Sequence, residues 1–337
     1  MAATPSTGRL GRNPFEPVTV KVKEPVPEPV AETVTETESE TETDTGKWDP
    51  RWGKVDLEFT QKLEPLLDAL YTVYFRCDIQ GWENVPDKKN GPALFVGNHN
   101  GLLTWEVLML FHAWLKQTGG ERPALGLAHG IAFGNPVFSW LTQRIGAIPA
   151  EPEIALGALK RGFDLMVYPG GEKESFRPFA ERAKVDFFGR QGFLRLALKA
   201  GVPIVPLASI GAHETYVILD RGEELAERLG LKEKFRLHGL PITPTSLLAM
   251  WCLSVGLITF FPLLLAPAIL ASAFIPLPAK MDFKILPAVD VCAIAREMGD
   301  SQGDKPETLQ RLYDLVVGQL QETVTTGYAG RKYPVVG

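Results

Sequence analysis

The chain alternates short apolar runs with segments whose apolar residues recur at helical spacing. Four runs have the length and composition of buried strands: 92–97, 124–128, 165–168 and 203–210. Helical spacing is found in 57–77, 104–116, 136–144, 152–162, 189–200 and 305–324. Strands that alternate with helices across short turns are typical of α/β domains. We therefore predict an α/β fold with a mainly parallel sheet flanked by helices.

The first 46 residues show neither the apolar spacing of a helix nor the pattern of a strand. They alternate Pro, Val, Glu and Thr, contain a single aromatic residue, Phe15, and have no leucine after Leu10. Such a stretch cannot bury enough apolar surface to offset the entropy lost on ordering. We expect residues 1–46 to be a disordered acidic leader and residues 47–337 to form one domain.

One segment does not fit a soluble domain. Residues 237–279 contain no Asp, Glu, Lys or Arg, and 247–266 are almost continuously apolar. Twenty apolar residues are long enough to span a bilayer. Four prolines in the second half favour a broken or re-entrant hairpin over a straight span, and a buried core helix is the alternative. We expect 246–279 to be a membrane-associated segment.

The charge balance narrows the possible functions. The net charge of −5 comes from the leader, which has nine acidic and four basic residues, so the rest of the chain is neutral. A neutral body argues against a nucleic-acid partner. Three widely separated cysteines exclude a disulfide scaffold and a short-spaced cysteine zinc site, and indicate a reducing compartment. No H-x-x-x-H or H-E-x-x-H spacing occurs, so we expect no metal site.

The first candidate for chemistry is the sequence Gly97-Asn98-His99-Asn100-Gly101, at the end of the 92–97 strand. In open α/β sheets, ligands bind beyond the carboxyl ends of the strands. A histidine in that turn is well placed to act as a general base near neutral pH. An isolated histidine is more often structural, so that reading also stands. The other histidines lie in an apolar helix, after a strand or in turns, and are weaker candidates: His112, His129, His213 and His238.

The second candidate is the loop 168–177, which also follows a buried strand. Its glycine pair, Gly170-Gly171, lets the backbone approach a ligand closely, and its amides are able to hold a carbonyl oxygen or a phosphate. Lys173 and Arg177 add positive charge, which suits an acidic ligand such as a phosphate or a coenzyme A tail. The alternative is a tight turn with solvated charges.

Taken in order, these segments resemble the glycerolipid acyltransferases, the superfamily that includes the lysophosphatidate acyltransferases. Asn98-His99 matches the start of an N-H-x4-D block, and 168–173 occupy the place of a P-E-G-T-R block. Val202–Pro206 reproduces a V-P-I-V-P block, after a helix opened by Arg190, and 148–150 are similar to an intermediate block. The likeness covers about residues 75–290. Residues 170–174 are also similar to the G-G-x-x-E motif of the type-2 diacylglycerol acyltransferase branch.

The sequence departs from the family pattern at two positions. The acid of N-H-x4-D is replaced by Thr104, and the nearest acid is Glu106. On one continuous helix, residues seven apart are separated by about 10 Å, so a bond between His99 and Glu106 requires 100–103 to be a loop. We expect Glu106 to be the orienting acid. The other departure is Gly170 in place of Glu, which weakens the case for a phosphate-bearing acceptor and favours a mono- or diglyceride or a long-chain alcohol.

The resemblance implies a membrane-associated O-acyltransferase of lipid metabolism, with its site facing the cytoplasm. It would move a fatty acyl group from acyl-CoA or an acyl-carrier protein to a glycerolipid hydroxyl, with no further cofactor. His99 would be the base and Glu106 its orienting acid, and the oxyanion or the substrate would be bound by Asn98, Gly170, Gly171, Lys173, Glu174, Arg177 and Arg190. A non-catalytic, membrane-seated lipid-binding protein is the main alternative, favoured by Thr104, and a lipid hydrolase is the third.

Overall fold

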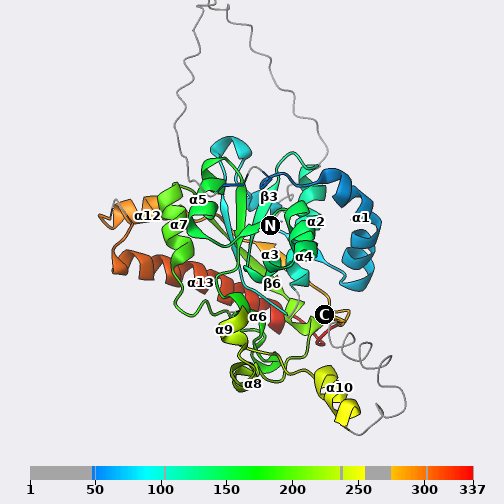
Figure 1. The fold of residues 1–337 in the computed structure, drawn as a ribbon. Helices are drawn as coiled ribbons and strands as arrows, with labels where there is room; N and C mark the ends of the chain where they lie inside the picture. The colour runs from blue at the N-terminus through cyan, green and yellow to red at the C-terminus, as the bar shows by residue number, and fades with distance from the viewer. Residues whose placement is uncertain are drawn as a thin grey trace, which may run out of the picture. The chain divides into compact units, whose positions relative to one another are not determined.

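The computed structural model describes residues 48–49, 51–101, 104–235, 238–254, 275–300 and 303–336. Within them, a seven-stranded sheet has the order β1-β7-β6-β2-β5-β3-β4 (Figure 1). The strands are β1 (Asp78–Gln80), β2 (Leu94–Gly97), β3 (Ala124–Ala128), β4 (Ala147–Pro149), β5 (Asp164–Val167), β6 (Ile204–Ile210) and β7 (Asp282–Ile285).

The middle of the sheet is parallel. β2 pairs in parallel with β5 and with β6, and β3 pairs in parallel with β4 and with β5. Only the pairing of β6 with β7 is antiparallel among the described strands, and β1 is parallel to β7. The predicted mainly parallel sheet is therefore confirmed. Because parallel strands share their direction, the carboxyl ends of β2, β5 and β6 meet at one edge of the sheet.

Two apolar clusters, one on each face of the sheet, form the core. Side chains alternate between the faces along β2, so that Leu94 and Val96 belong to one cluster and Phe95 belongs to the other. Figure 1 shows α5, α7, α12 and α13 on one side of the sheet and α1 and α2 on the other. The described helices are α1 (Leu57–Ala69), α2 (Trp105–Thr118), α3 (Ile131–Gly134), α4 (Pro136–Arg144), α5 (Pro152–Lys160), α6 (Gly171–Ser175), α7 (Gly192–Ala200), α8 (Glu223–Arg228), α9 (Leu231–Phe235), α10 (Pro244–Ser254), α12 (Val291–Glu297) and α13 (Pro306–Ala329).

The structure differs from the sequence prediction chiefly in its short strands. β1, β4 and β7 have three or four residues and partly exposed side chains, so they lack the apolar run that identifies a buried strand. Helix α13 continues to Ala329, beyond the predicted end at 324. Helix α2 begins at Trp105, because Thr104 adopts a left-handed conformation with φ of 53° and cannot belong to it.

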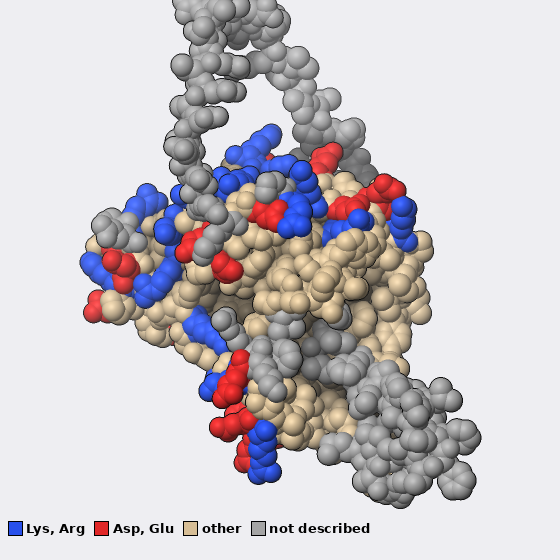
Figure 2. Space-filling view, viewed as in Figure 1, with Lys and Arg blue, Asp and Glu red and all other residues tan. Residues whose placement is uncertain are grey.

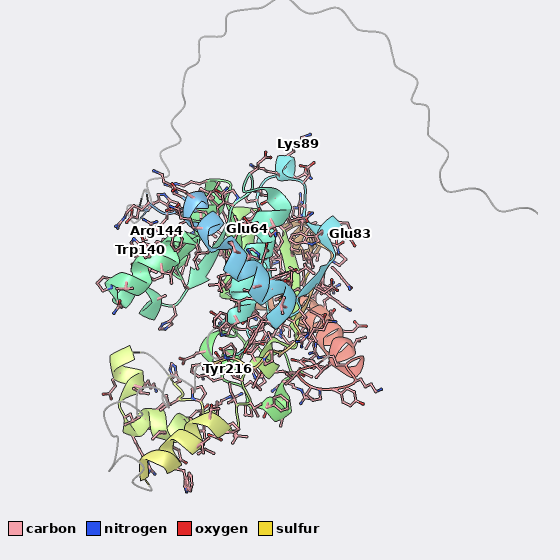
Figure 3. The ribbon with its side chains drawn as sticks, turned by 90° about the vertical axis from the view of Figure 1, so that its right-hand side faces the viewer. Glu64, Glu83, Lys89, Trp140, Arg144 and Tyr216 are labelled. Atoms are coloured by element: carbon pink, nitrogen blue, oxygen red, sulfur yellow. The ribbon has the colours of Figure 1, made fainter. Side chains whose placement is uncertain are left out.

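One face of the molecule presents apolar side chains between charged regions. Figure 2 shows residues of both charges around this face and uncharged residues over α3 and α4. On α4, Val137 and Trp140 are exposed. The Arg144 guanidinium lies 4.4 Å from the centre of the Trp140 ring, and both residues are labelled in Figure 3. Exposed aromatic and aliphatic side chains grouped on one helix are typical of a contact surface.

The predicted leader, residues 1–46, and most of the predicted membrane segment, residues 255–274, lie outside the described part of the chain. Helix α10 covers the start of that segment. Its Leu248 and Trp251 side chains are each 57% exposed, so they are not core residues. None of the described helices is both long enough and apolar enough to cross a bilayer.

Candidate active site

The turn that follows β2 is fixed to the neighbouring strand β6 by Asn98. The Asn98 side chain accepts a hydrogen bond from the Ser209 amide at 2.8 Å and donates one to the Ser209 carbonyl at 2.9 Å. Asn98 is only 1% exposed, and this paired contact uses both ends of its amide. The prediction that Asn98 binds substrate is therefore replaced by a positioning role, because its polar atoms are engaged inside the protein.

The next residue, His99, contacts Glu106 as the sequence led us to expect. The distance from His99 Nδ1 to Glu106 Oε1 is 2.7 Å. Glu106 is 1% exposed, whereas the His99 side chain is 14% exposed and so reaches the surface of the site. When the carboxylate accepts this bond, Nδ1 carries the proton, and the neutral imidazole then has its lone pair on Nε2. This geometry leaves Nε2 able to accept a proton from a ligand.

The backbone around Glu106 makes this contact possible. Helix α2 starts one residue earlier, at Trp105, whose Nε1 donates to the Tyr216 hydroxyl at 3.0 Å. Glu106 thus lies in the first turn, where the helix dipole favours a negative charge. Its Oε1 also accepts the Asn100 amide at 2.9 Å. Thr104, which occupies the family's acid position, makes no side-chain capping bond to the helix.

The ring of Tyr168, at the end of β5, lies beside the His99 imidazole. Their ring centres are 5.0 Å apart and the planes are tilted by 33°. A Cβ atom at Gly97 would come within 2.7 Å of the Tyr168 ring, so glycine is required there for this approach. Tyr168 thereby packs beside the His99 imidazole, and Gly97 leaves room for the Tyr168 ring. The predicted strand ends, on β2 and β5, are brought together as expected.

Glu174, from α6, binds the backbone of His99. Its Oε2 accepts the His99 amide at 3.0 Å, and its Oε1 accepts the Asp186 amide at 3.2 Å. Arg177 Nη2 lies 3.4 Å from Oε1. Glu174 is 0% exposed and Arg177 is 1% exposed. Both were predicted to bind substrate; because both are buried and paired, we assign them instead to holding the His99 backbone.

Burial has the largest effect on the pKa of Glu174. It raises the pKa of this carboxyl from its ordinary value of 4.5 to about 7, although Arg177 and the amide of His99 act in the opposite direction. Between these two pH values, the folded protein holds the proton more tightly than the unfolded chain does. The contribution of Glu174 to the free energy of unfolding therefore falls as the pH rises from 4.5 to 7.

We expect Glu174→Gln to flatten this pH dependence, because glutamine does not titrate. Denaturant unfolding of both proteins at several pH values between 4.5 and 7 gives the two slopes, and comparison with wild type cancels the contribution of other carboxyls. The variant should also lose activity, since one oxygen of glutamine cannot accept the bonds of two. Parallel slopes for wild type and variant would show that Glu174 does not titrate in this range.

The glycine pair fits tightly against the same carboxylate. A Cβ atom at Gly170 would lie 2.1 Å from Glu174 Oε2, so no larger residue fits while Glu174 is in place. The Gly171 amide donates to the Tyr168 carbonyl at 3.0 Å. It is therefore already used in the turn, and the prediction that it holds an oxyanion does not fit this conformation.

The predicted basic residues divide into buried and accessible groups. Arg190 is exposed, and its Nη1 donates to the carbonyls of Pro169 at 2.9 Å and Gly170 at 3.1 Å. Lys173 is partly buried, with Nζ 5.8 Å from the centre of the Phe188 ring. Arg190 and Lys173 thus remain candidates for contact with an acidic group of a substrate, unlike the buried Arg177.

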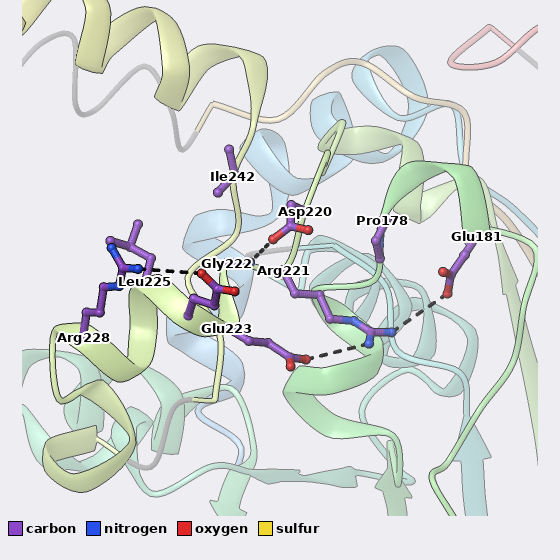
Figure 4. A pocket seen from close by; sticks show the side chains of 10 residues that line it. Pro178, Glu181, Asp220, Arg221, Gly222, Glu223, Leu225, Arg228 and Ile242 are labelled. Atoms are coloured by element: carbon purple, nitrogen blue, oxygen red, sulfur yellow. Dashed lines mark hydrogen bonds and ion pairs between the residues drawn. The ribbon is translucent and has the colours of Figure 1, made fainter.

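A separate pocket, lined in part by α8, does not carry this chemistry. It measures about 620 Å³. The Arg221 guanidinium in this pocket lies between two carboxylates: Nη2 is 4.0 Å from Glu181 Oε2, and Nη1 is 3.8 Å from Glu223 Oε1 (Figure 4). None of the described residues that line it is a histidine, serine or cysteine. Over the described ranges, no group of three or more His, Cys, Asp or Glu side chains is placed to hold a metal ion.

Comparison with known proteins places this site in a family context. The family model named Acyltransferase matches residues 76–210, which include His99, Glu106 and the glycine pair. The uncharacterized protein Rv0502 of Mycobacterium tuberculosis is 30% identical over 270 residues, which is 80% of this chain and 66% of that protein. The chain thus spans about two thirds of the length of this curated relative.

Two further relatives have named activities. A chloroplastic 1-acyl-sn-glycerol-3-phosphate acyltransferase of Brassica napus is 28% identical over 159 residues, covering 45% of this chain and 41% of that protein. A chicken (Gallus gallus) protein, described as a DGAT1/2-independent enzyme synthesizing storage lipids, is 26% identical over 155 residues, covering 46% and 44%. Among solved structures, the lysophosphatidate acyltransferase PlsC of Thermotoga maritima matches with a TM-score of 0.46, at 17% identity over 81% of this chain and 80% of that one.

Proposed function

Because the chain belongs to the glycerolipid acyltransferase superfamily, we propose that it moves a fatty acyl group from acyl-CoA to a hydroxyl group of a glycerolipid. The observation that carries this proposal is the 2.7 Å contact between His99 Nδ1 and Glu106 Oε1, which in the neutral imidazole places the proton on Nδ1 and the lone pair on Nε2 of a partly exposed side chain. A base with a fixed tautomer is what acyl transfer to a weakly acidic alcohol requires.

The proposed reaction needs one base and no covalent enzyme intermediate. His99 Nε2 takes the proton of the acceptor hydroxyl as its oxygen attacks the thioester carbonyl carbon, and Glu106 stabilises the imidazolium that forms. When the tetrahedral intermediate collapses, the C–S bond breaks and the leaving thiolate takes the proton from Nε2. The products are an ester and free coenzyme A, and His99 returns to its starting state.

We propose a neutral acceptor, a mono- or diglyceride, ahead of lysophosphatidate. Gly170 stands where the family's P-E-G-T-R block has Glu, and Glu174 fills the space that a larger residue would need. The chicken relative that is described as synthesizing storage lipids supports the same choice. A phosphate on donor or acceptor would be met by Lys173 and Arg190, the accessible basic residues of the site.

A panel of acceptors supplied with labelled acyl-CoA tests the proposal. Purified protein should form labelled ester with a mono- or diglyceride at a higher rate than with lysophosphatidate, and a long-chain alcohol serves as a third acceptor. Acyl-carrier protein loaded with the same acyl group tests the donor. Binding of lipid without formation of an ester would favour the alternative of a non-catalytic lipid-binding protein, for which Thr104 in place of the family's acid was the argument. Fatty acid released without acceptor would favour the hydrolase.

We also propose that α10 helps to seat the protein on a membrane, with the active site on the cytoplasmic side. Leu248 and Trp251 are exposed on a helix that lies within the uncharged 237–279 segment. Apolar and tryptophan side chains on one surface bind at the boundary between lipid headgroups and acyl chains. Such a location would bring the active site to lipid substrates.

Replacing Leu248 and Trp251 together with glutamine should move protein from the membrane fraction to the soluble fraction, since it removes apolar area that would enter the bilayer. Leu229→Gln is the matched control, because Leu229 is 51% exposed but lies at the end of α8, outside the uncharged segment. Fractionation of cells that express each protein gives the distribution. Unchanged distribution of the double variant would remove α10 from the membrane contact.

A further inference from the structure

Three successive backbone amides around His99 are each bonded to a buried side chain. Glu174 accepts the His99 amide and Glu106 accepts the Asn100 amide. The third, the Gly101 amide, donates to His213 Nδ1 at 3.3 Å. The three acceptors come from α6, from α2 and from the short 3₁₀ helix Ala212–Thr215 that follows β6. Side chains from three different elements thus bind the backbone of this turn. The sequence predicted no role for the third side chain, His213.

His213 joins two parts of the site. It is 0% exposed, and its Nε2 donates to the Arg177 carbonyl at 2.6 Å. Because Nε2 donates and Nδ1 accepts, the imidazole must be neutral and in a single tautomer. Burial lowers the pKa of His213 to about 4, so the ring keeps this form near neutral pH. His213 therefore connects the His99 turn to the segment that follows Glu174.

The surroundings fix His213 in turn. The adjacent residue, Glu214, pairs with Arg331 at 3.0 Å and accepts the Val335 amide at 2.6 Å, so the end of the chain holds the 3₁₀ helix. On the other side, Ser175 Oγ donates to the Gly101 carbonyl. The backbone of Gly101 is therefore bound both at its amide and at its carbonyl.

We propose that His213 is a positioning residue for the reaction: by bonding the Gly101 amide and the Arg177 carbonyl, it keeps His99 Nε2 directed at the acceptor hydroxyl. This inference rests on the proposed acyl transfer. His213 touches neither the acceptor nor the thioester, so its loss should lower kcat and leave KM for acyl-CoA unchanged. Misplacement of a catalytic group by about 1 Å costs up to roughly 100-fold in rate, so we expect a loss of about 10- to 100-fold.

Three substitutions separate the two contacts of His213. His213→Leu removes both. His213→Asn places a carbonyl oxygen near the position of Nδ1 and restores the bond from Gly101, whereas His213→Gln places an amide nitrogen near Nε2 and restores the bond to Arg177. We expect Asn to retain more kcat than Gln, because Gly101 belongs to the His99 turn.

The control is His112→Leu. His112 is also buried, at 5% exposure, and bonds a side chain, Asp68, at 2.8 Å, but it lies in α2 away from the turn. It should lower the melting temperature without lowering kcat of the folded protein. Two results would overturn the proposal. One is a loss of activity in the His213 variants that is fully explained by a smaller folded fraction. The other is a kcat of His213→Leu within about twofold of the wild-type value.

Amide hydrogen exchange of residues 98–101 gives a readout that does not depend on activity. Exchange there should be faster in His213→Leu and unchanged in His112→Leu, because only the first loses the acceptor of the Gly101 amide. Unchanged exchange in His213→Leu would also overturn the inference. A wild-type protein without acyl transfer would instead refute the proposed function, and the exchange measurement would still decide whether His213 holds the turn.

Discussion

Replacing His99 with alanine should abolish acyl transfer while the protein remains folded. The substitution removes the base whose ring nitrogen Nδ1 is oriented by the buried acid Glu106. Loss of a general base costs about 10²- to 10⁴-fold in rate. His99 is a turn residue with a partly exposed side chain, so its removal leaves both apolar clusters intact. Initial rates of ester formation, measured with a saturating acceptor, give the loss.

The matched control is His129→Ala. His129 also follows a strand, β3, and its side chain is exposed. This variant should keep its activity. Melting curves for both variants show whether they fold. A folded His99→Ala protein with wild-type rates would rule out the mechanism, whatever the reaction proves to be.

Glu106→Gln should have the second largest effect. The amide is able to donate to Nδ1, which would place the imidazole proton on Nε2 and remove the lone pair that the acceptor proton needs. We expect a loss of about 10²- to 10⁴-fold in kcat. Gln has nearly the same shape as Glu, so α2 should persist, but His99 Nδ1 and the Asn100 amide bond the same oxygen, Oε1, and an amide nitrogen placed there gives up the Asn100 bond. Steady-state kinetics at several pH values measure the loss.

Thr104→Ala is the companion variant, since Thr104 occupies the family's acid position. Its side chain makes no capping bond to α2, and alanine, which is not β-branched, adopts the left-handed backbone with no more difficulty than threonine. We therefore expect little change in kcat. The opposite ranking, a strong effect of Thr104→Ala and a weak effect of Glu106→Gln, would mean that the Thr104 hydroxyl orients His99.

The sequence predicted the edge of the sheet where the site lies. The runs that became β2 and β5 are continuously apolar because they are buried on both faces, and His99 and the glycine pair follow them directly. The contact with Glu106 was expected from the resemblance to the acyltransferase family, and the spacing indicated that it requires a loop, because seven residues on one helix would be too far apart. The loop that brings them together depends on α2 starting no earlier than Trp105.

Other parts of the site depend on packing that the sequence does not display. Glu174 and Arg177 look like solvated charges in a loop, but tertiary contacts bury both and turn them toward the His99 backbone. His213 is 114 residues beyond His99, and no local pattern links them. Neighbouring strands, β2 and β6, bring these distant segments to the same edge. Roles of this kind are visible only when the fold is known.

The measurement that tests the central claim most directly is the release of free coenzyme A by purified wild-type protein, followed together with ester and fatty acid. In the presence of a diglyceride, one ester should form for each coenzyme A released, and release should stop when the acceptor is left out. His99→Ala should show neither product. Coenzyme A released at the same rate without acceptor, with fatty acid in equal amount, would contradict the account, because His99 would then activate water and not a lipid hydroxyl.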